Sequence, residues 1–166
     1  MYKENYEKKA DLIRKRPALL SLIKSANLLF TITGFTAYPL LLLLQFRKKG
    51  VKAVSYVIIP GTAFVLVSAA RRMIGRKRPY ESHEITPLID KESTGNSFPS
   101  RHVFSLFLIA FLWISVSIPA AVCLTAAAVI LAAIRVIAGV HYLSDVIAGA
   151  FLGIFSAVLT LFSASD

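Results

Sequence analysis

The chain has 166 residues, 56% of them hydrophobic, and its 19 Lys and Arg against 9 Asp and Glu give a formal charge of +10. A mean hydropathy of +0.66 with only 17% charged residues excludes an ordinary soluble enzyme, in which about a quarter of residues are charged. High hydrophobicity excludes intrinsic disorder, and a single cysteine, Cys123 in an apolar run, excludes a disulfide scaffold. These values predict one basic domain, 1–166, that lies in a membrane.

The first 24 residues are strongly charged, with seven basic and three acidic side chains. Residues 1–17 are too charged to insert and lack a secretory cleavage pattern, so we do not expect a cleaved signal peptide. We predict an interfacial helix whose Tyr2, Tyr6, Leu12 and Ile13 lie at the headgroup boundary while its cations meet anionic lipid. The alternative is a solvated basic tail.

Four long stretches carry no charge: 25–46, 53–70, 103–134 and 146–165. About 20 apolar residues are needed to cross roughly 30 Å of hydrocarbon. The third stretch would form a helix of roughly 48 Å, and Pro119 is expected to divide it. The sequence therefore predicts an all-α polytopic bundle of about five transmembrane helices. Their expected spans are 26–46, 53–72, 101–118, 120–138 and 143–163.

With alternating crossings, segment 71–102, turn 136–142 and the N-terminus share one membrane face, and loop 47–52 lies on the other with the C-terminus. Ionisable side chains beside spanning helices are functional candidates by default. The first face collects Arg71, Arg72, Arg76, Lys77, Arg78, Ser100, Arg101, His102, Arg135, His141 and Asp145.

Three short patterns in this face are more specific than a basic cluster. They are R-x6-R-P from Arg71, P-S-R-H from Pro99, and I-R-x5-H-x3-D from Ile134. In this order they resemble the signature of the type 2 phosphatidic acid phosphatase (PAP2) superfamily of membrane lipid phosphatases, K-x6-R-P, P-S-G-H and S-R-x5-H-x3-D. The resemblance implies hydrolysis of a lipid phosphate through a phosphohistidine intermediate, without a metal or other cofactor.

The sequence departs from that signature at three positions. Arg71 replaces a lysine and keeps the charge on a planar fork, and Ile134 replaces a serine and removes one hydroxyl donor. Arg101 replaces a glycine, where the absence of a side chain permits a positive φ or a close backbone approach. We expect activity to be retained with an altered fit of the substrate.

The arginines and Ser100 are candidate phosphate-binding residues. A phosphomonoester carries about −1.5 to −2 charges, and guanidinium groups bind its oxygens in a bidentate manner. We therefore expect Arg71, Arg78 and Arg135 to converge on one anion, assisted by Ser100 and Arg101. Ser100 has the alternative role of a helix N-cap. The neighbouring Arg72, Arg76 and Lys77 are expected to reach toward lipid headgroups instead.

His141, Asp145 and His102 are the candidate catalytic residues. His141 and Asp145 are four residues apart, so they share one helix face. Asp145 can orient the imidazole through Nδ1 and leave Nε2 as a nucleophile, and the resemblance implies a phosphohistidine at His141. The alternative is a His-Asp pair that only caps the helix. His102 has the properties of a general acid for the leaving oxygen and a base for water.

Two other features have competing interpretations. A metal site could use His83, Glu84, Asp90, Glu92, His102, His141 and Asp145, but the surrounding cations repel a divalent ion, and we expect segment 81–97 to be a solvated loop that gates the pocket. Gly149, Gly153 and Ala157 form a small-residue stripe that permits close helix packing, with a homodimer seam as the alternative.

These observations predict a lipid phosphatase of the bacterial plasma membrane, whose partners are the bilayer and a lipid phosphate and not nucleic acid. Polyprenyl diphosphate, such as undecaprenyl diphosphate, is the favoured substrate, with phosphatidylglycerol phosphate and phosphatidic acid as alternatives. A lipid phosphotransferase and a non-catalytic protein that binds anionic lipid are the rival functions. The resemblance implies an extracytoplasmic active site, whereas the positive-inside rule favours the opposite orientation.

Overall fold

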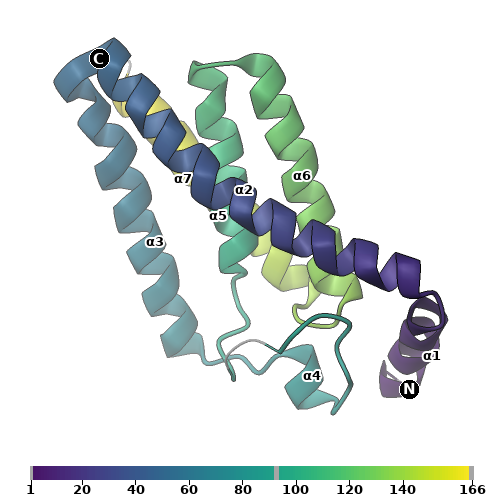
Figure 1. Cartoon of the computed structure of the whole chain (residues 1–166). Coiled ribbons are helices and arrows are strands. Elements are labelled where there is room, and N and C mark those ends of the chain that lie inside the picture. Colours follow the sequence, from purple (N-terminus) through teal and green to yellow (C-terminus); the bar gives the residue numbers. More distant parts are fainter. Residues whose placement is uncertain (1, 92–93, 165–166) are drawn as a thin grey trace.

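The structure is a computed structural model that describes residues 2–91 and 94–164. Helix is the only regular secondary structure in this described part, so the predicted all-α fold is confirmed. Figure 1 shows the elements in chain order. They are α1 (Tyr2–Arg14), α2 (Pro17–Lys49), the 3-10 helix η1 (Gly50–Val54), α3 (Ser55–Ile74), α4 (Pro79–Ser82), α5 (Arg101–Leu112), the 3-10 helix η2 (Trp113–Ser115), α6 (Ile118–Ile137) and α7 (Leu143–Ser163).

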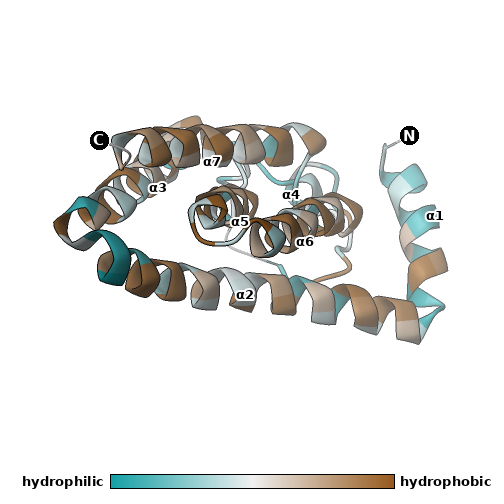
Figure 2. Cartoon of the chain, turned by 90° about the horizontal axis from the view of Figure 1, so that it is seen from above, coloured by the Kyte–Doolittle hydropathy of each residue, from teal (hydrophilic) through white to brown (hydrophobic). Residues whose placement is uncertain are grey.

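Helix α5 is the centre of the bundle. Viewed from above, α5 and α6 lie between α2 on one side and α7 on the other, with α3 at one end (Figure 2). Eight of the twelve residues of α5 are buried, including Phe104, Leu108 and Leu112, which belong to one apolar cluster with Leu41 of α2 and Val67 of α3. Since neighbours cover α5 on most sides, this helix meets little lipid.

Small residues allow α7 to pack directly on α5. A Cβ added to Gly149 would lie 2.6 Å from the carbonyl oxygen of Ser100, and one added to Gly153 would collide with the carbonyl oxygen of Phe104. The predicted stripe therefore brings two backbones together within one chain. The alternative of a homodimer seam on this stripe is wrong, because α5 already occupies it.

Large apolar side chains are exposed along the outer faces of α2, α3, α6 and α7, far beyond the single apolar patch of a soluble monomer. By length and composition, three helical stretches of the described chain can cross a membrane: Pro17–Ser82, which contains α2 and α3, and then α6 and α7. Helix α5 has only 12 residues, roughly 18 Å. The count of five crossings therefore stays a prediction.

Two helix boundaries differ from the predicted ones by more than three residues. Helix α2 begins at Pro17 instead of residue 26, because proline is well suited to the first helical position. Helix α5 ends at Leu112 instead of residue 118, where η2 turns the chain and the Ser117 hydroxyl accepts a hydrogen bond from the backbone N–H of Ala120. Pro119 lies in the first turn of α6, so the predicted break of this apolar stretch is confirmed.

Helix α1 packs against the protein at the end of the bundle that carries α4 (Figure 1). Tyr6 and Ile13 pack on an apolar cluster with Ile85 and Leu88, and the Tyr6 hydroxyl donates to the Ala138 carbonyl at 2.9 Å. Burial raises the pKa of Tyr6 to about 12, so this hydroxyl keeps its proton. The helix is present as predicted, and the alternative prediction of a solvated tail is wrong. Of the four side chains expected at the headgroup boundary, Leu12 is the most exposed.

The segment that follows α4 is held against α1 and is not a fully solvated loop as predicted. Ile85, Leu88 and Ile89 are buried. The Glu7 carboxylate accepts a hydrogen bond from the backbone N–H of Thr86 at 2.8 Å, and Arg14 donates to the Thr86 carbonyl at 2.5 Å. Helix α1 therefore fixes the position of this segment relative to the bundle.

Candidate active site

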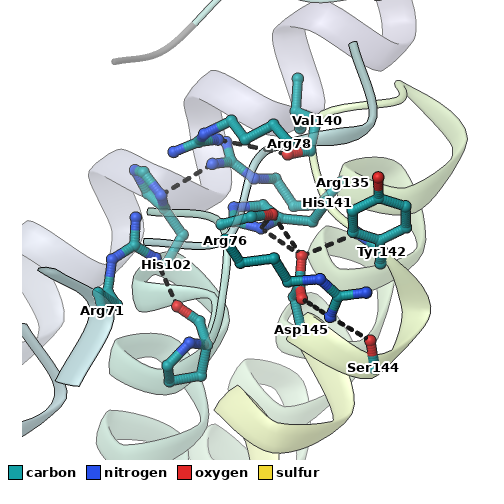
Figure 3. A network of polar contacts seen from close by, with 12 residues as sticks. Arg71, Arg76, Arg78, His102, Arg135, Val140, His141, Tyr142, Ser144 and Asp145 are labelled. Atoms are coloured by element: carbon teal, nitrogen blue, oxygen red, sulfur yellow. Dashed lines mark hydrogen bonds and ion pairs between the residues drawn. The ribbon is translucent and has the colours of Figure 1, made fainter. Parts of the chain in front are cut away.

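The predicted site residues converge at one end of the bundle from four parts of the chain (Figure 3). Arg71 lies in the last turn of α3, and Ser100 directly precedes α5. Arg135 lies in the last turn of α6, and Asp145 in the first turn of α7. The ends of α3 and α6 and the starts of α5 and α7 thus bring together residues that are far apart in the sequence.

His141 and Asp145 form a buried pair, with exposed fractions of 2% and 0%. The imidazole Nδ1 lies 3.4 Å from Asp145 Oδ2, and the Ser97 hydroxyl lies 3.4 Å from the same nitrogen and donates to Oδ2 at 2.5 Å. The carboxylate also accepts from the Tyr142 backbone N–H at 2.9 Å. Both Nδ1 contacts lie on one side of the ring, so Nε2 points away from the carboxylate. Ser97 was missed because one serine in a polar loop gives no spacing signal.

The guanidinium of Arg76 contacts the second oxygen of this carboxylate. Its Nη1 donates to Asp145 Oδ1 and to the Ser144 hydroxyl, both at 2.8 Å, and the group lies over the Tyr142 ring at 4.2 Å (Figure 3). The expectation that Arg76 reaches toward headgroups is therefore wrong. The buried carboxylate provides a better partner than a headgroup, because ion pairs strengthen as water is excluded.

Three other arginines surround the histidines and are almost completely buried, with exposed fractions of 4% for Arg71 and 1% for Arg78 and Arg135. Backbone carbonyls orient the first two. Arg71 donates to Pro99, and Arg78 donates to Gly95 and Val140, both at 3.3 Å. Arg135 donates to the Asn27 side chain at 3.4 Å, and its Nη2 lies 3.0 Å from His102 Nδ1.

A local hydrogen-bond network positions Arg78. The Glu81 carboxylate accepts from the backbone N–H of Arg78 at 2.7 Å and from that of Gly95 at 2.8 Å. Gly95 has φ +64°, a conformation that glycine adopts readily. Glu81 therefore connects the start of α4 to the segment that carries Ser97. Only the three-dimensional arrangement identifies Glu81, Gly95 and Asn27 as supporting residues.

Ser100 has a buried hydroxyl with no hydrogen-bond partner among the described residues. Its backbone N–H donates to the Asp145 carbonyl at 2.9 Å, and its side chain makes no capping bond to α5. The N-cap alternative for this hydroxyl is therefore wrong. A buried donor without a partner costs free energy, so this hydroxyl is available to donate a hydrogen bond to a ligand.

A cavity of about 510 Å³ extends from His102 between α2, α3 and α5. Its walls are mainly apolar and include Phe30, Phe35 and Phe64. His102 lines this cavity and also contacts Arg135, so it separates the arginine cluster from the apolar groove. Arg101 is exposed and lies in the groove, with its guanidinium carbon 6.0 Å from the centre of the Phe64 ring.

Within residues 2–91 and 94–164, no three His, Cys, Asp or Glu side chains are grouped as a metal site would require. Glu92, one member of the alternative metal set, lies outside the described residues. Asp145 is already bound by Arg76, Ser97 and the Tyr142 N–H. Its carboxylate is therefore directed at the protein's own donors.

The sequence profile of the PAP2 superfamily matches residues 51–165. The chain belongs to the PAP2 superfamily. The matched region contains all three sequence patterns and begins within η1, so α1 and α2, with Asn27, precede the PAP2 match. Membership makes this chain a phosphatase, and its apolar helices make it a membrane protein.

Two solved structures of PAP2 proteins are similar to this chain. LpxE of Aquifex aeolicus is 25% identical with a TM-score of 0.65, covering 87% of this chain and 93% of its own. The first transmembrane PAP2 type phosphatidylglycerolphosphate phosphatase from Bacillus subtilis is 25% identical with a TM-score of 0.69, covering 96% and 83%. A comparison with curated protein sequences finds no match.

Proposed function

We propose that the protein hydrolyses a lipid phosphate or diphosphate through a phosphohistidine at His141. The observation that carries this proposal is a buried imidazole whose Nδ1 contacts a carboxylate, at the point where three buried arginines converge. This arrangement combines an oriented nucleophile with binding groups for an anion. PAP2 membership and the similarity to a phosphatidylglycerolphosphate phosphatase support it.

Phosphate binding is assigned to the arginines and Ser100. Arg71, Arg78 and Arg135 donate to the phosphoryl oxygens, and the Ser100 hydroxyl gains the acceptor that it lacks in the described protein. Backbone N–H groups at the N-terminus of α5 add positive potential. These donors also stabilise the charge that develops on the oxygens in the transition state.

The chemical steps use the two histidines in turn. Nε2 of His141 attacks phosphorus while the bond to the leaving oxygen breaks, and Asp145 stabilises the charged imidazole. Arg135 donates to Nδ1 of His102, so the transferable proton of His102 lies on Nε2, from which it reaches the leaving oxygen. Water, deprotonated by His102, then attacks the phosphohistidine and releases phosphate.

The apolar groove suits a lipid tail. Its volume of about 510 Å³ lies in the range of small-molecule sites. His102 lies at one end of the groove, and the proposed reaction requires the leaving oxygen of the substrate to lie beside it. A polyprenyl diphosphate, phosphatidylglycerol phosphate or phosphatidic acid would place its chain there and its phosphate among the arginines. A lipid substrate thereby accounts for both the apolar groove and the arginine cluster beside it.

The proposed setting is the plasma membrane of a bacterium, where α2, α3, α5, α6 and α7 form the membrane bundle and α5 is enclosed by the others. The active end then lies at the extracytoplasmic surface, as inferred from family resemblance. No metal takes part in the proposed reaction, because three buried guanidinium groups repel a divalent cation and attract the phosphate.

The decisive experiment measures phosphate release by the full-length protein in detergent with EDTA, together with the phosphoenzyme. Wild type is expected to release phosphate and to form an acid-labile, base-stable phosphoenzyme, and His141→Ala is expected to do neither. His83→Ala is the matched control, because His83 lies outside the arginine cluster and is one of only three histidines in the chain. Release by His141→Ala would refute the nucleophile, and loss of wild-type release in EDTA would refute the metal-free reaction.

A further inference from the structure

Arg101 differs in position from the other arginines of the site. Arg71, Arg78 and Arg135 are buried among the helix ends, whereas the Arg101 side chain is exposed in the apolar groove against Phe64. Phe64 and Arg71 are both on α3, seven residues apart, which corresponds to roughly 10 Å along the helix axis. The Arg101 guanidinium therefore lies further along the groove than the phosphate-binding cluster.

The groove gives this cation an unusual environment. Among the described residues that line the groove, Arg101 is the only Lys, Arg, Asp or Glu. No ion pair joins Arg101 to an acidic residue in the described part of the chain. A cation beside an apolar, membrane-embedded surface is costly unless an anion pairs with it, so its position predicts an anionic ligand in the groove.

The position of His102, next to Arg101, indicates which part of the substrate carries the anion that Arg101 binds. His102 lines the groove next to Arg101, and the proposed reaction requires it to face the leaving oxygen. Arg101 is therefore on the side of the leaving group. The transferred phosphoryl group is on the opposite side of His102, among the buried arginines.

We propose that Arg101 binds a second phosphate group, carried by the leaving group of the substrate. The inference rests on the proposed function and narrows its substrates to lipids that retain a phosphate after hydrolysis. With a lipid diphosphate, His141 Nε2 bonds to the terminal phosphorus as the bond from that phosphorus to the bridging oxygen breaks. The bridging oxygen keeps the electron pair, receives the proton of His102 and leaves as part of the lipid monophosphate, and Arg101 stabilises the negative charge that develops on this phosphate in the transition state.

Three lipids distinguish where the second phosphate must be. In polyprenyl diphosphate a bridging oxygen joins the second phosphate to the transferred one, and in phosphatidylglycerol phosphate a glycerol separates the two. Phosphatidic acid has none, because its leaving group is the neutral diacylglycerol. A guanidinium that binds the second phosphate by charge-assisted hydrogen bonds should raise kcat/KM for one or both of the first two lipids and not for the third.

The test is kcat/KM for phosphate release from these three lipids, measured for full-length wild type and Arg101→Gln in the same detergent. Arg101→Gln is expected to lose roughly 10- to 100-fold on at least one doubly phosphorylated lipid and to change less than about threefold on phosphatidic acid. Loss on polyprenyl diphosphate alone assigns an adjacent phosphate, and loss on phosphatidylglycerol phosphate alone assigns the separated one.

Arg72→Gln is the matched control, because Arg72 is an exposed arginine near the end of α3 and should leave all three rates unchanged. Arg101→Lys, which keeps the positive charge, should restore part of the preference. An equal loss of Arg101→Gln on all three lipids, or no loss on any, would overturn the inference while wild-type release upholds the proposed function. Absence of wild-type release from every lipid would overturn both.

Discussion

Each oxygen of the Asp145 carboxylate has its own partners. Oδ1 pairs with Arg76, and Oδ2 contacts His141, the Ser97 hydroxyl and the Tyr142 N–H. The bonds from Arg76 and Tyr142 hold the carboxylate still, and a carboxylate held in this way can fix the ring orientation of His141. At the scale of single residues, the orientation of the His141 ring therefore depends on Arg76 and Ser97 as well as on Asp145.

Asp145→Asn should lower kcat roughly 10²- to 10⁴-fold with a small change in KM, because an amide neither stabilises the imidazolium nor selects the same tautomer. Steady-state phosphate release measures both constants. Asp90→Asn, at an exposed carboxylate, is the control and should match wild type. A variant of Asp145 that alters KM alone would show that the carboxylate acts in substrate binding and not on the nucleophile.

Ser100→Ala should lower kcat/KM roughly 10- to 100-fold, the effect of one hydrogen bond to a charged group. The same change should leave the thermal midpoint equal or higher, because the buried Oγ has no partner in the described protein. Activity and thermal unfolding of the same preparations separate the two effects. A lower midpoint with full activity would restore the N-cap role and remove Ser100 from the phosphate site.

At the scale of elements, the contact between α5 and α7 controls the distance between the two halves of the site. Ser100 directly precedes α5, Asp145 lies in the first turn of α7, and one backbone hydrogen bond joins the two residues. Gly149 and Gly153 permit this distance along the two helices. A wider separation would move the Ser100 hydroxyl away from the His141–Asp145 pair.

Gly153→Ala should destabilise the protein by about 1–3 kcal/mol, because its Cβ meets the rigid backbone carbonyl of Phe104 and the helices must move apart. Gly61→Ala in α3 is the matched control, since nothing lies within 4 Å of its added Cβ and alanine favours a helix. Thermal unfolding in one detergent compares the two. Equal midpoints would mean that α5 and α7 separate without cost.

Helix α1 should release from segment 81–97 in acid. Glu7 accepts the Thr86 N–H and contacts Arg14, and these interactions hold the pKa of its carboxyl below the usual 4.5. A lowered pKa stabilises the docked state above pH 4.5, and this contribution is lost as the pH falls through the folded value. Hydrogen exchange of α1 amides, corrected for intrinsic rates, should rise in this range for wild type. Glu7→Gln should remove that pH dependence, and an unchanged dependence would assign it to another group.

At the scale of the whole molecule, the active site, the loop after α4 and helix α1 all lie at one end, and η1 and the end of α7 lie at the other (Figure 1). The positive charge is also divided between the two ends, with Arg47, Lys48, Lys49 and Lys52 at the second end. The number of positive charges at each end therefore gives only a weak preference for one membrane orientation. The buried arginines at the first end do not count toward the positive-inside rule in the way that exposed loop residues do.

An impermeant maleimide applied to intact cells tests the orientation in a Cys123→Ala background. Lys9→Cys and Val51→Cys place single, exposed cysteines at opposite ends of the molecule. The proposed extracytoplasmic site predicts labelling of position 9 and protection of position 51. Labelling of position 51 alone would place the active site on the cytoplasmic face, and labelling of both after lysis verifies that each cysteine reacts.

The sequence by itself determined the all-helical membrane class and the three patterns at the helix ends. Uncharged stretches of 18 or more residues leave few alternatives to helices in a membrane, and the spacing of four between His141 and Asp145 places both on one face of a helix. It also predicted the division of the third apolar stretch at Pro119. These features are local, since each depends on hydrophobicity or on spacing within one element.

Only the tertiary structure decided how Arg76, Ser97, Glu81 and Asn27 support the site, that Arg101 lies in the groove, and that α1 packs on the loop after α4. These contacts join residues far apart in the chain, or depend on which way a side chain leaves a loop. Neither long-range contact nor side-chain direction in a loop produces a periodic pattern in the sequence. Among many arginines near helix ends, only packing separates those that contact a buried carboxylate from those that face lipid, because the outcome depends on which neighbours exclude water.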